Sequence, residues 1–540
     1  MKGKTKRVLA LVLTALMLVS VLSACGQTQP GSGNTATPSN SSTPAPSTDN
    51  STPTPEAPFK PDISKEVTLK WMYIGSNNVT DDKAVMEKVN AYLKEKINAK
   101  LEMIWRGWGA DFDDRVQLAV NSGEKIDIYF TCSWTPNNEY AAMSKKGVHV
   151  RLDNPDNNLL EKYAPDLFKS LDPVLADAAK TEGADGFGIY GIPTYKEIAQ
   201  QYTWDLNMDT LKKYGYTADD IKDFYEFGPI LDKIKKGEGK NYFPLNPETA
   251  VLERTVNNSD LVDANSLLSY VFDPVDPTKS GAKIVSRYET PEYKKFVEKM
   301  REYYQAGYVN PEMANAQTMT NALVAAQNTA QYAIGTQVYL PGYEYQTSAT
   351  RKIEVAYKPA QSGIISTTSA RGAMHAISTA SDNPERALML LNLVNTDPTL
   401  FTMLEFGLEG VHYTKESDGS VKFNVDMRNT YRPWKAGLGN QFNLPRESTD
   451  PANILEMLDS FNKLGKPVPI LGWAFDAEPV KKEIAALGSI VQGHRDPLNA
   501  GAVDPATKLP EFISALKANG IDKVVAEAQK QLDAFMAAKK

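Results

Sequence analysis

The chain has 540 residues, of which 42% are hydrophobic, 23% charged and 9% aromatic. This composition is typical of a globular protein and the length exceeds one ordinary domain, which excludes a fibre, a small module and a fully disordered chain. After the N-terminal region no apolar run reaches the length of a membrane span, and a formal charge of −7 without a long basic run disfavours nucleic acid as the main partner.

The first 24 residues have the pattern of a secretory signal peptide. Basic residues at positions 2, 4, 6 and 7 precede an apolar stretch of 14 residues, Val8–Val21, which is short for a membrane span. The following Leu-Ser-Ala-Cys25-Gly resembles the bacterial lipobox. This resemblance implies that Cys25 becomes the lipidated N-terminus of the mature protein, held outside the cell by acyl chains in the membrane. Ordinary secretion is the alternative.

Residues 25–58 form a low-complexity linker in this interpretation. From Gly26 to Pro58 the sequence contains no Leu, Ile, Val, Met or aromatic residue. Such a segment cannot bury a core, so we expect a disordered tether between the membrane and a folded body that begins near Phe59. If Cys25 is lipidated, the second cysteine, Cys132, has no intramolecular partner, and we interpret it as a small buried side chain.

The next elements alternate between strands and helices. Strand-forming residues fill 67–74, 100–105 and 126–130, while amphipathic patterns predict helices over 82–98 and from Asp111 onward. The order β-α-β-α-β predicts a parallel sheet covered by helices, which is the α/β class. Ligands of such sheets bind beyond the carboxyl ends of the strands. Those ends are residues 75–78, 106–109 and 131–138.

Few residues suggest catalysis or metal binding. A phosphate-binding loop, a Gly-x-Ser-x-Gly elbow and a His-Glu-x-x-His motif are absent from the sequence. The four histidines are widely spaced, and we interpret them as structural or surface residues rather than zinc ligands. Residues 153–161 resemble a calcium loop superficially, but Pro155 occupies a ligand position. We therefore expect a protein that is not an enzyme and has no metal or cofactor.

Tryptophan is the remaining signal. Trp108 and Trp134 fall in loops just beyond two predicted strands. A tryptophan in such a loop offers a flat apolar face with a polar edge, which suits a sugar ring, although a role in the core is equally consistent with the sequence. Trp71 lies inside a strand and is predicted to be a core residue.

From about Val67 onward the chain resembles the extracellular solute-binding proteins of ABC importers, in the family 1 branch that includes maltose-binding protein. The segments that carry the resemblance, in order, are Asp127-Ile-Tyr-Phe-Thr-Cys-Ser-Trp134 with residues 140–153, Gly188-Ile-Tyr-Gly-Ile-Pro193, residues 230–245 and residues 372–393. Segments from residue 437 onward are similar to a subfamily of long Gram-positive lipoproteins that have an extra C-terminal segment: 437–442, 475–480, 501–505 and 509–527.

This resemblance implies a type II binding-protein fold of two α/β lobes, each a mixed or parallel sheet flanked by helices, with the ligand cleft at the hinge. The boundaries expected for the first lobe are 59–195 plus 332–370. Those expected for the second lobe are 196–331 plus 371–540, including the C-terminal extension.

The resemblance also implies a set of ligand-binding residues. Residues 75–77, 108, 133, 134 and 137 match loops of the first lobe, Tyr195 and Lys196 match the hinge, and Tyr339, Trp434 and Gln441 match aromatic or second-lobe positions. The full set is Gly75, Ser76, Asn77, Trp108, Ser133, Trp134, Asn137, Tyr195, Lys196, Tyr339, Trp434 and Gln441. The third-strand loop lacks the acidic residue of maltose-binding protein, which argues against maltose as the ligand.

The resulting prediction is a lipid-anchored extracellular binding protein, monomeric and not bound to nucleic acid. It would capture a carbohydrate, with an oligosaccharide as the expected ligand, and deliver it to the permease subunits of an ABC transporter. Three alternatives stay open at this point. The same fold could bind a peptide or another polar solute, it could present a ligand to a membrane sensor kinase, or the chain could be a secreted hydrolase.

Overall fold

The computed structural model divides the chain into residues 1–58 and a compact unit of residues 59–540. The predicted signal peptide, the linker and Cys25 lie outside the described residues. The structure describes residues 59–539 except 76–78, 136–137, 264–265, 426, 428–429 and 432–436. Within this part of the chain, no helix is both long and apolar enough to cross a membrane.

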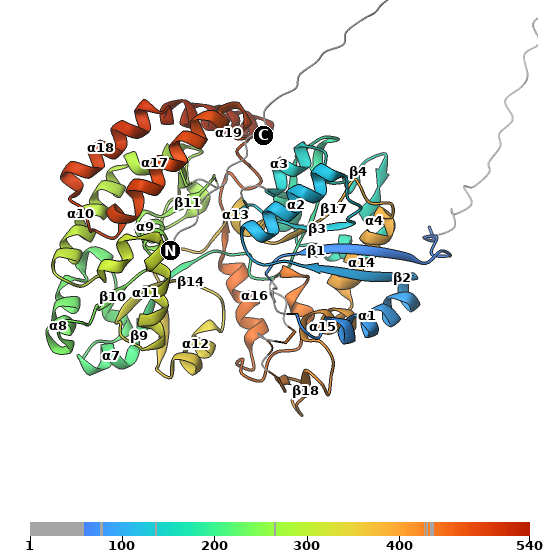
Figure 1. Ribbon diagram of the computed structural model, residues 1–540, viewed down its shortest axis with the longest axis horizontal. Coiled ribbons are helices and arrows are strands. Elements are labelled where there is room, and N and C mark those ends of the chain that lie inside the picture. The colour runs from blue at the N-terminus through green and yellow to red at the C-terminus, as the bar shows by residue number, and fades with distance from the viewer. Residues whose placement is uncertain are drawn as a thin grey trace, which may run out of the picture. The chain divides into compact units, whose positions relative to one another are not determined.

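The first lobe is built on a five-stranded sheet with the order β2-β1-β3-β17-β8. Its strands are β1 (Val67–Tyr73), β2 (Ala99–Trp105), β3 (Ile128–Thr131), β17 (Met374–Ile377) and β8 (Ile192–Pro193). Strand β1 pairs in parallel with β2 and β3, and β17 runs antiparallel to β3. Helices α1 (Asp82–Ile97) and α2 (Ala110–Ser122) connect the first three strands (Figure 1). This confirms the predicted β-α-β-α-β unit.

Helix α1 illustrates how the local sequence produces these elements. Its buried residues are Val85, Met86, Val89, Leu93 and Ile97, which recur at the spacing of one helical face. The helix ends at Asn98, whose φ of 47° is the left-handed conformation that asparagine tolerates well. Strand β2 begins at the next residue, so the turn places β2 directly beside β1.

The second lobe contains a four-stranded sheet with the order β10-β14-β9-β15 and a three-stranded sheet with the order β11-β12-β13. The first of these has β10 (Leu245–Asn246), β14 (Ile334–Val338), β9 (Tyr202–Asn207) and β15 (Val355–Pro359). The second has β11 (Ser259–Leu261), β12 (Leu268–Val271) and β13 (Ile284–Ser286). The helices of this part of the chain are α7 (Met208–Lys213), α8 (Gly228–Glu238), α9 (Thr249–Asn257), α10 (Pro291–Gln305), α11 (Ala316–Asn328) and α12 (Tyr343–Arg351).

The later lobe boundaries differ from those expected, and two segments change places. Residues 332–370 were expected in the first lobe, but their strands β14 and β15 both pair with β9 of the second. Residues from 371 were expected in the second lobe, but β17 pairs with β3 and with β8 of the first. Near residue 370 the chain therefore crosses from the second lobe to the first, whereas a crossing from the first lobe to the second was expected. Strand pairing over long sequence separations decides this, and local pattern carries no information about it.

The core is divided in the same way. A first cluster of buried residues includes Trp71 and Phe130 together with Leu388 and Phe401 from helices α14 (Pro384–Thr396) and α15 (Pro398–Phe406). A second cluster surrounds the sheets of the second lobe. A third, smaller cluster lies where the chain crosses between lobes and contains Leu175, Ile198, Ile365, Phe461 and Leu471.

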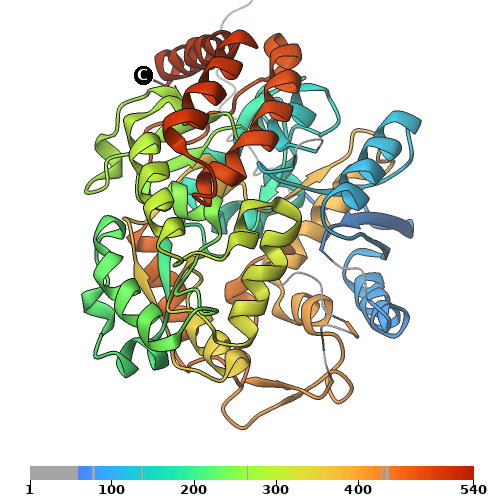
Figure 2. The ribbon, with the colours of Figure 1, turned by 60° about the vertical axis from the view of Figure 1, so that its left-hand side comes forward.

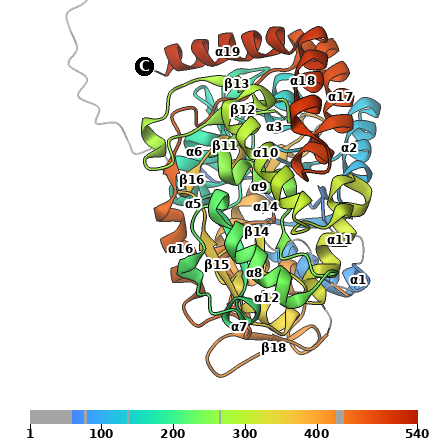
Figure 3. The same cartoon turned by 90° about the vertical axis from the view of Figure 1, so that its left-hand side faces the viewer.

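The C-terminal helices pack on the second lobe. They are α17 (Lys481–Asn499), α18 (Pro505–Ala518) and α19 (Ile521–Ala538), and they follow α16 (Ile454–Leu464). Helix α17 packs against α9, α10 and α18, and α19 packs against β13. Figures 2 and 3 show these red helices beside the green helices of the second lobe. Buried side chains such as Leu487, Phe512 and Leu532 belong to the second core.

Short elements complete the fold. In the first lobe these are α3 (Tyr140–Lys145), β4 (Asp153–Asn154), β5 (Asn157–Asn158), α4 (Leu159–Tyr163), α5 (Pro165–Ser170), α6 (Pro173–Ala179), β6 (Lys180–Gly183), β7 (Gly186–Ile189), β18 (Tyr413–Lys415) and β19 (Val421–Phe423). At the crossing they are β16 (Ile364–Ile365), α13 (Thr367–Ala370) and β20 (Lys466–Pro467).

Candidate functional site

The candidate site lies at the carboxyl ends of the parallel strands β1, β2 and β3. Tyr73 and Trp105 are paired at the ends of β1 and β2, and the amide of Arg106 donates a 2.9 Å hydrogen bond to the carbonyl of Tyr73. The next residues of each loop, among them Gly75 and Trp108, therefore emerge from the same edge of the sheet. Gly75 has a φ of 88°, which a residue with a side chain rarely adopts.

Two exposed tryptophans meet at this edge. The ring centroids of Trp108 and Trp134 are 6.1 Å apart with an interplanar angle of 34°. Trp108 is 53% exposed and Trp134 38% exposed, whereas Trp71 is completely buried in the core, as predicted. The indole nitrogen of Trp134 donates a 2.7 Å hydrogen bond to the carbonyl of Gly372, which fixes the orientation of its ring. Exposed aromatic faces held in place in this way can stack on an apolar ligand surface.

The β3–α3 loop (residues 132–139), which carries Trp134, is tied down at both ends. The hydroxyl of Thr131 donates to the carbonyl of Asn138 at 2.9 Å, and the side-chain amide of Asn138 donates to the carbonyl of Phe130 at 2.8 Å. The amide of Tyr140 donates to the carbonyl of Cys132 at 2.9 Å. These bonds hold the two described ends of the loop in place, so less entropy is lost when a ligand binds there.

Cys132 at the base of this loop is a free, fully buried thiol. Burial raises the pKa of the thiol to about 12, because the thiolate is poorly solvated there. The thiol contacts the hydroxyl of Thr135 at 3.4 Å. The prediction of a small buried side chain is confirmed.

Helix α13 joins the β3–α3 loop to the second lobe. The hydroxyl of Ser133 donates to the carbonyl of Thr368 at 3.0 Å, and the hydroxyl of Thr368 in turn donates to the carbonyl of Leu261 in β11 at 3.1 Å. Ser366 caps the helix with a capping box that includes Ser369. A single residue of the crossing segment thus contacts the candidate site on one side and the second lobe on the other.

The other predicted residues lie around the crossing between lobes. Tyr195 stacks on Phe442 with ring centroids 4.9 Å apart, and its carbonyl accepts a 2.9 Å hydrogen bond from the amide of Gln441. Tyr339 packs edge-on against Phe461 at 5.2 Å. Four further predicted positions, Ser76, Asn77, Asn137 and Trp434, lie outside the described residues.

Lys196 was expected to face the cleft, but the structure buries it. Its side chain is 8% exposed, and the ammonium forms a short ion pair with the carboxylate of Glu197. Its carbonyl accepts a 2.8 Å hydrogen bond from Asn462 of α16. Lys196 therefore helps to hold the crossing segments together in this arrangement.

Carboxylates near the tryptophans are engaged in local structure. Asp111 accepts a 2.7 Å hydrogen bond from the amide of Gly107, and Glu139 caps α3 by accepting a 2.7 Å bond from the amide of Ala142. Among the described residues, no group of three or more His, Cys, Asp or Glu side chains is arranged to hold a metal ion.

Each histidine makes structural contacts, as predicted. His149 and His375 are buried, and burial lowers the pKa of each imidazole to about 3. His412 bonds to the amide of Leu408 and to Asp81, and His494 stacks on Phe512.

Sequence reasoning missed a group of residues at this site and one residue of the second lobe. The carbonyls of Thr368, Arg371 and Gly372 accept hydrogen bonds from the β3–α3 loop. Their sequence signal is the Ser/Thr-rich run before Gly372, which is typical of a helix cap. Glu248 follows β10, its amide bonding to the hydroxyl of Thr336 at 3.1 Å, and burial raises the pKa of its carboxyl. Strands β10 and β14 are parallel neighbours, so Glu248 and Tyr339 leave the same edge of the second sheet.

These features define a class: a two-lobed α/β binding protein with an aromatic site at the strand ends of one lobe and crossing segments between the lobes. Comparisons with known proteins agree. The chain is 28% identical over 494 residues to the "Carbohydrate ABC transporter substrate-binding protein" of Streptococcus pneumoniae serotype 4, covering 89% of this chain and 93% of that protein. The chain is thus a homologue of a carbohydrate ABC transporter substrate-binding protein.

Solved structures give the same fold. The N-glycan transport solute binding protein NgtS of S. pneumoniae matches with a TM-score of 0.72 at 26% identity, covering 88% of this chain and 100% of that one. NgtS in complex with Man5GlcNAc matches with a lower TM-score of 0.63. The alginate-binding protein AlgQ2, at 15% identity and a TM-score of 0.58, covers 86% of this chain and 98% of its own and shares the fold. Residues 469–537 match a family described as a domain of unknown function (DUF3502).

Proposed function

We propose that this protein is a lipid-anchored extracellular substrate-binding protein that captures an oligosaccharide and delivers it to an ABC permease. The observation that carries the proposal is the pair of exposed tryptophans, 6.1 Å apart, at the carboxyl ends of β2 and β3. The homologue named as a carbohydrate substrate-binding protein and the complexes of NgtS with Man1GlcNAc and Man5GlcNAc support a carbohydrate as the ligand class.

The chemistry of the site fits a sugar. The C–H face of a pyranose packs on an indole, while its hydroxyl rim needs polar partners that direct hydrogen bonds. Ser133 and Gly75 would supply such partners from the first lobe, and Gln441 from the crossing. Glu248 and Tyr339 would approach from the strand ends of the second lobe.

Capture would work by closure of the two lobes. A ligand that touches both lobes favours the closed arrangement by its differential affinity for that state, and the permease would read the closed shape. Thr368, which bonds to Ser133 on one side and to Leu261 on the other, lies on the path along which closure would be transmitted.

The anchor rests on the sequence. The signal-like segment and the lipobox-like Leu-Ser-Ala-Cys25 support lipidation of Cys25. The low-complexity stretch up to residue 58 would act as a tether with an r.m.s. reach of roughly 30 Å.

Neither alternative chemistry gains support from a specific contact. A peptide ligand needs fixed charges for its termini, but Lys196 is already paired with Glu197. A glycosidase needs two carboxylates flanking the scissile bond, but Asp111 and Glu139 accept backbone hydrogen bonds within their own loops.

A thermal-shift screen of the purified chain tests the proposal. The panel holds Man5GlcNAc, other neutral oligosaccharides, monosaccharides, short peptides and amino acids. Ligand at 100 times its Kd adds about 2.7 kcal/mol to the free energy of unfolding, which corresponds to a shift of a few degrees in a body of this size. We expect a shift with one oligosaccharide series. A shift with peptides alone would refute the carbohydrate assignment, and release of reducing sugar during incubation would refute a purely binding role.

A further inference from the structure

Arg371 is a fully buried arginine that joins three stretches of chain. Its Nε donates to the carbonyl of Ala178 at 2.6 Å, and its Nη2 donates to the carbonyls of Lys180 at 2.8 Å and Gly472 at 2.9 Å. The guanidinium also lies over the ring of Tyr140, 5.2 Å from the centroid. These bonds connect the end of α6 and the start of β6 in the first lobe with the C-terminal segment, which we define as residues 469–537.

A guanidinium in this position is costly to bury. Desolvation lowers the pKa of Arg371, although nearby Tyr140 and Glu139 oppose this effect. An apolar side chain of similar volume would fill the same space without a desolvation cost. The contacts made by the guanidinium are therefore the feature of Arg371 that distinguishes it from a packing residue.

The backbone around Arg371 holds the β3–α3 loop. The carbonyl of Arg371 accepts a 3.1 Å hydrogen bond from the amide of Ser133. The carbonyl of the next residue, Gly372, accepts the 2.7 Å bond from the indole of Trp134. A side chain would be crowded at position 372, because a Cβ there would approach the carbonyl oxygen of Ser369 to 3.0 Å. The backbone that follows the Arg371 side chain is therefore bonded directly to Ser133 and Trp134.

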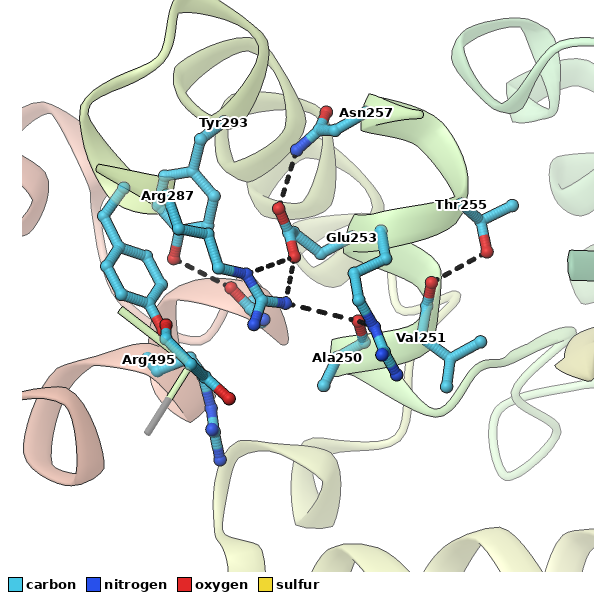
Figure 4. Close-up of polar contacts among 12 residues, drawn as sticks. Ala250, Val251, Glu253, Thr255, Asn257, Arg287, Tyr293 and Arg495 are labelled. Carbon is cyan, nitrogen blue, oxygen red and sulfur yellow. Dashed lines mark hydrogen bonds and ion pairs between the residues drawn. The ribbon is translucent and has the colours of Figure 1, made fainter. Parts of the chain in front are cut away.

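The C-terminal segment, which contacts Arg371 through Gly472, is also bonded to the second lobe. Figure 4 shows the buried ion pair of Arg287 with Glu253 and, beside it, Tyr293. The hydroxyl of Tyr293 donates a 2.8 Å hydrogen bond to Asn499 of α17. Arg301 of α10 donates to the carbonyl of Gly501 at 3.0 Å. Helix α17 is thereby fixed to α10 and the residues before it.

The start of the same segment contacts the crossing and the first lobe. The amide of Gly472 donates to the hydroxyl of Thr367 at 2.9 Å, and Gly472 has a φ of 94°. Four residues later, Asp476 forms a 2.6 Å ion pair with Lys145 of α3. Residues 472–476 therefore connect a segment carried by the second lobe to the supports of the tryptophan site in the first.

We propose that Arg371 is a positioning residue that couples the C-terminal segment to the β3–α3 loop. Through it, residues 469–537 set the position of Trp134 and Ser133, and thus ligand affinity, without touching the ligand. This rests on the proposed function for the affinity effect, whereas the structural coupling is independent of any ligand.

Hydrogen–deuterium exchange on the ligand-free chain tests the coupling. We expect Arg371→Met to speed exchange of the amides in residues 131–140 and 469–480 about tenfold or more, while α8 and α10 keep wild-type rates. Arg386→Met is the matched control. Arg386 is also a buried arginine that donates to carbonyls, those of Asp62, Lys65, Ile97 and Asn98, but it lies at the opposite end of β1 and β2. It should speed exchange around residues 62–98 and leave 131–140 unchanged. Equal exchange in 131–140 for the two variants would overturn the proposal.

Two further variants keep the test decisive. Thr367→Val leaves Arg371 unchanged but removes the hydroxyl that accepts from the amide of Gly472 and donates to the carbonyl of Ile470 at 3.5 Å. We expect about fivefold faster exchange in 131–140 from the loss of these bonds. If Arg371→Met does not fold, this variant decides alone, and unchanged exchange in 131–140 refutes the coupling. Arg371→Lys keeps the charge but not the three-way geometry, so we expect it to behave like Arg371→Met, and wild-type exchange would contradict the geometric role.

Affinity is measured in parallel by calorimetry with Man5GlcNAc as the probe. We expect Arg371→Met to raise Kd about tenfold more than Arg386→Met does. If the wild-type protein does not bind the probe, the proposed ligand class is questioned, but the exchange experiment still decides the coupling. If the probe binds and both variants change Kd equally, the claim that the C-terminal segment affects affinity is wrong.

Discussion

Replacing Trp108 with alanine should weaken ligand binding without changing the stability of the fold. The indole is 53% exposed, so of a side-chain surface of about 250 Å² some 130 Å² is open, and a sugar ring covering one face would bury about 65 Å². At about 25 cal/mol per Å², this contact contributes about 1.6 kcal/mol, which corresponds to a loss of about 15-fold in affinity for Trp108→Ala. The same reasoning for Trp134, which is 38% exposed, gives about 1.2 kcal/mol and a loss of about eightfold.

Isothermal titration calorimetry with the oligosaccharide that gives the largest thermal shift measures both losses. The double variant need not show their product, because the two rings are in contact and their effects can couple. Phe168→Ala is the control, since Phe168 is an exposed aromatic of similar accessibility, at 40%, on helix α5. The reasoning is refuted if Trp108→Ala binds within twofold of the wild type, or if Phe168→Ala weakens binding as much as the tryptophan variants do.

Four other predictions concern stability, reactivity and localisation. Arg287→Met should lower the free energy of unfolding measured in urea by about 3–5 kcal/mol, because it leaves the buried carboxylate of Glu253 without its cation. Adding Glu253→Leu should recover part of that loss, and an equal loss in the single and double variants would contradict this. The pKa of His149 falls from 6.5 to about 3 on folding, so the unfolded chain binds more protons, and this histidine lowers stability by about 2 kcal/mol between pH 7 and pH 5. His375 has the same lowered pKa, so His149→Gln should reduce the pH dependence of the urea midpoint by about that amount and leave the contribution of His375. With the pKa of its thiol raised to about 12, Cys132 should resist iodoacetamide at pH 8 in the native protein and react once the chain is unfolded in urea. Cys25→Ser should move the protein from the membrane fraction to the medium, and retention in the membrane fraction would refute lipid anchoring at this residue.

Local pattern was sufficient to predict the first unit of the fold. The apolar spacing of α1 and the strand-forming run of β1 depend on neighbouring residues, so the elements from residue 67 to 131 could be derived from periodicity. The positions of Trp108 and Trp134 followed from the rule that loops after parallel strands share one edge of the sheet. Their exposure was not predictable, because a tryptophan after a strand can equally well fill the core.

Long-range pairing accounts for what the sequence could not predict. Within residues 332–370, strand β14 pairs with β9, more than a hundred residues earlier in the chain, and β17 pairs with β3. The segments before and after residue 370 therefore belong to the opposite lobes from those expected. The burial of Lys196 and its pairing with Glu197 have no sequence signal. The role of Arg371 depends on three carbonyl groups from distant segments and is visible only in three dimensions.

The most direct test of the account is a crystal structure with the oligosaccharide selected by the thermal-shift screen. We predict a sugar ring in van der Waals contact with Trp108 or Trp134 and, in the same molecule, hydrogen bonds from the ligand to both lobes. A sugar bound elsewhere on the protein, or one that contacts neither tryptophan, would contradict the proposed site.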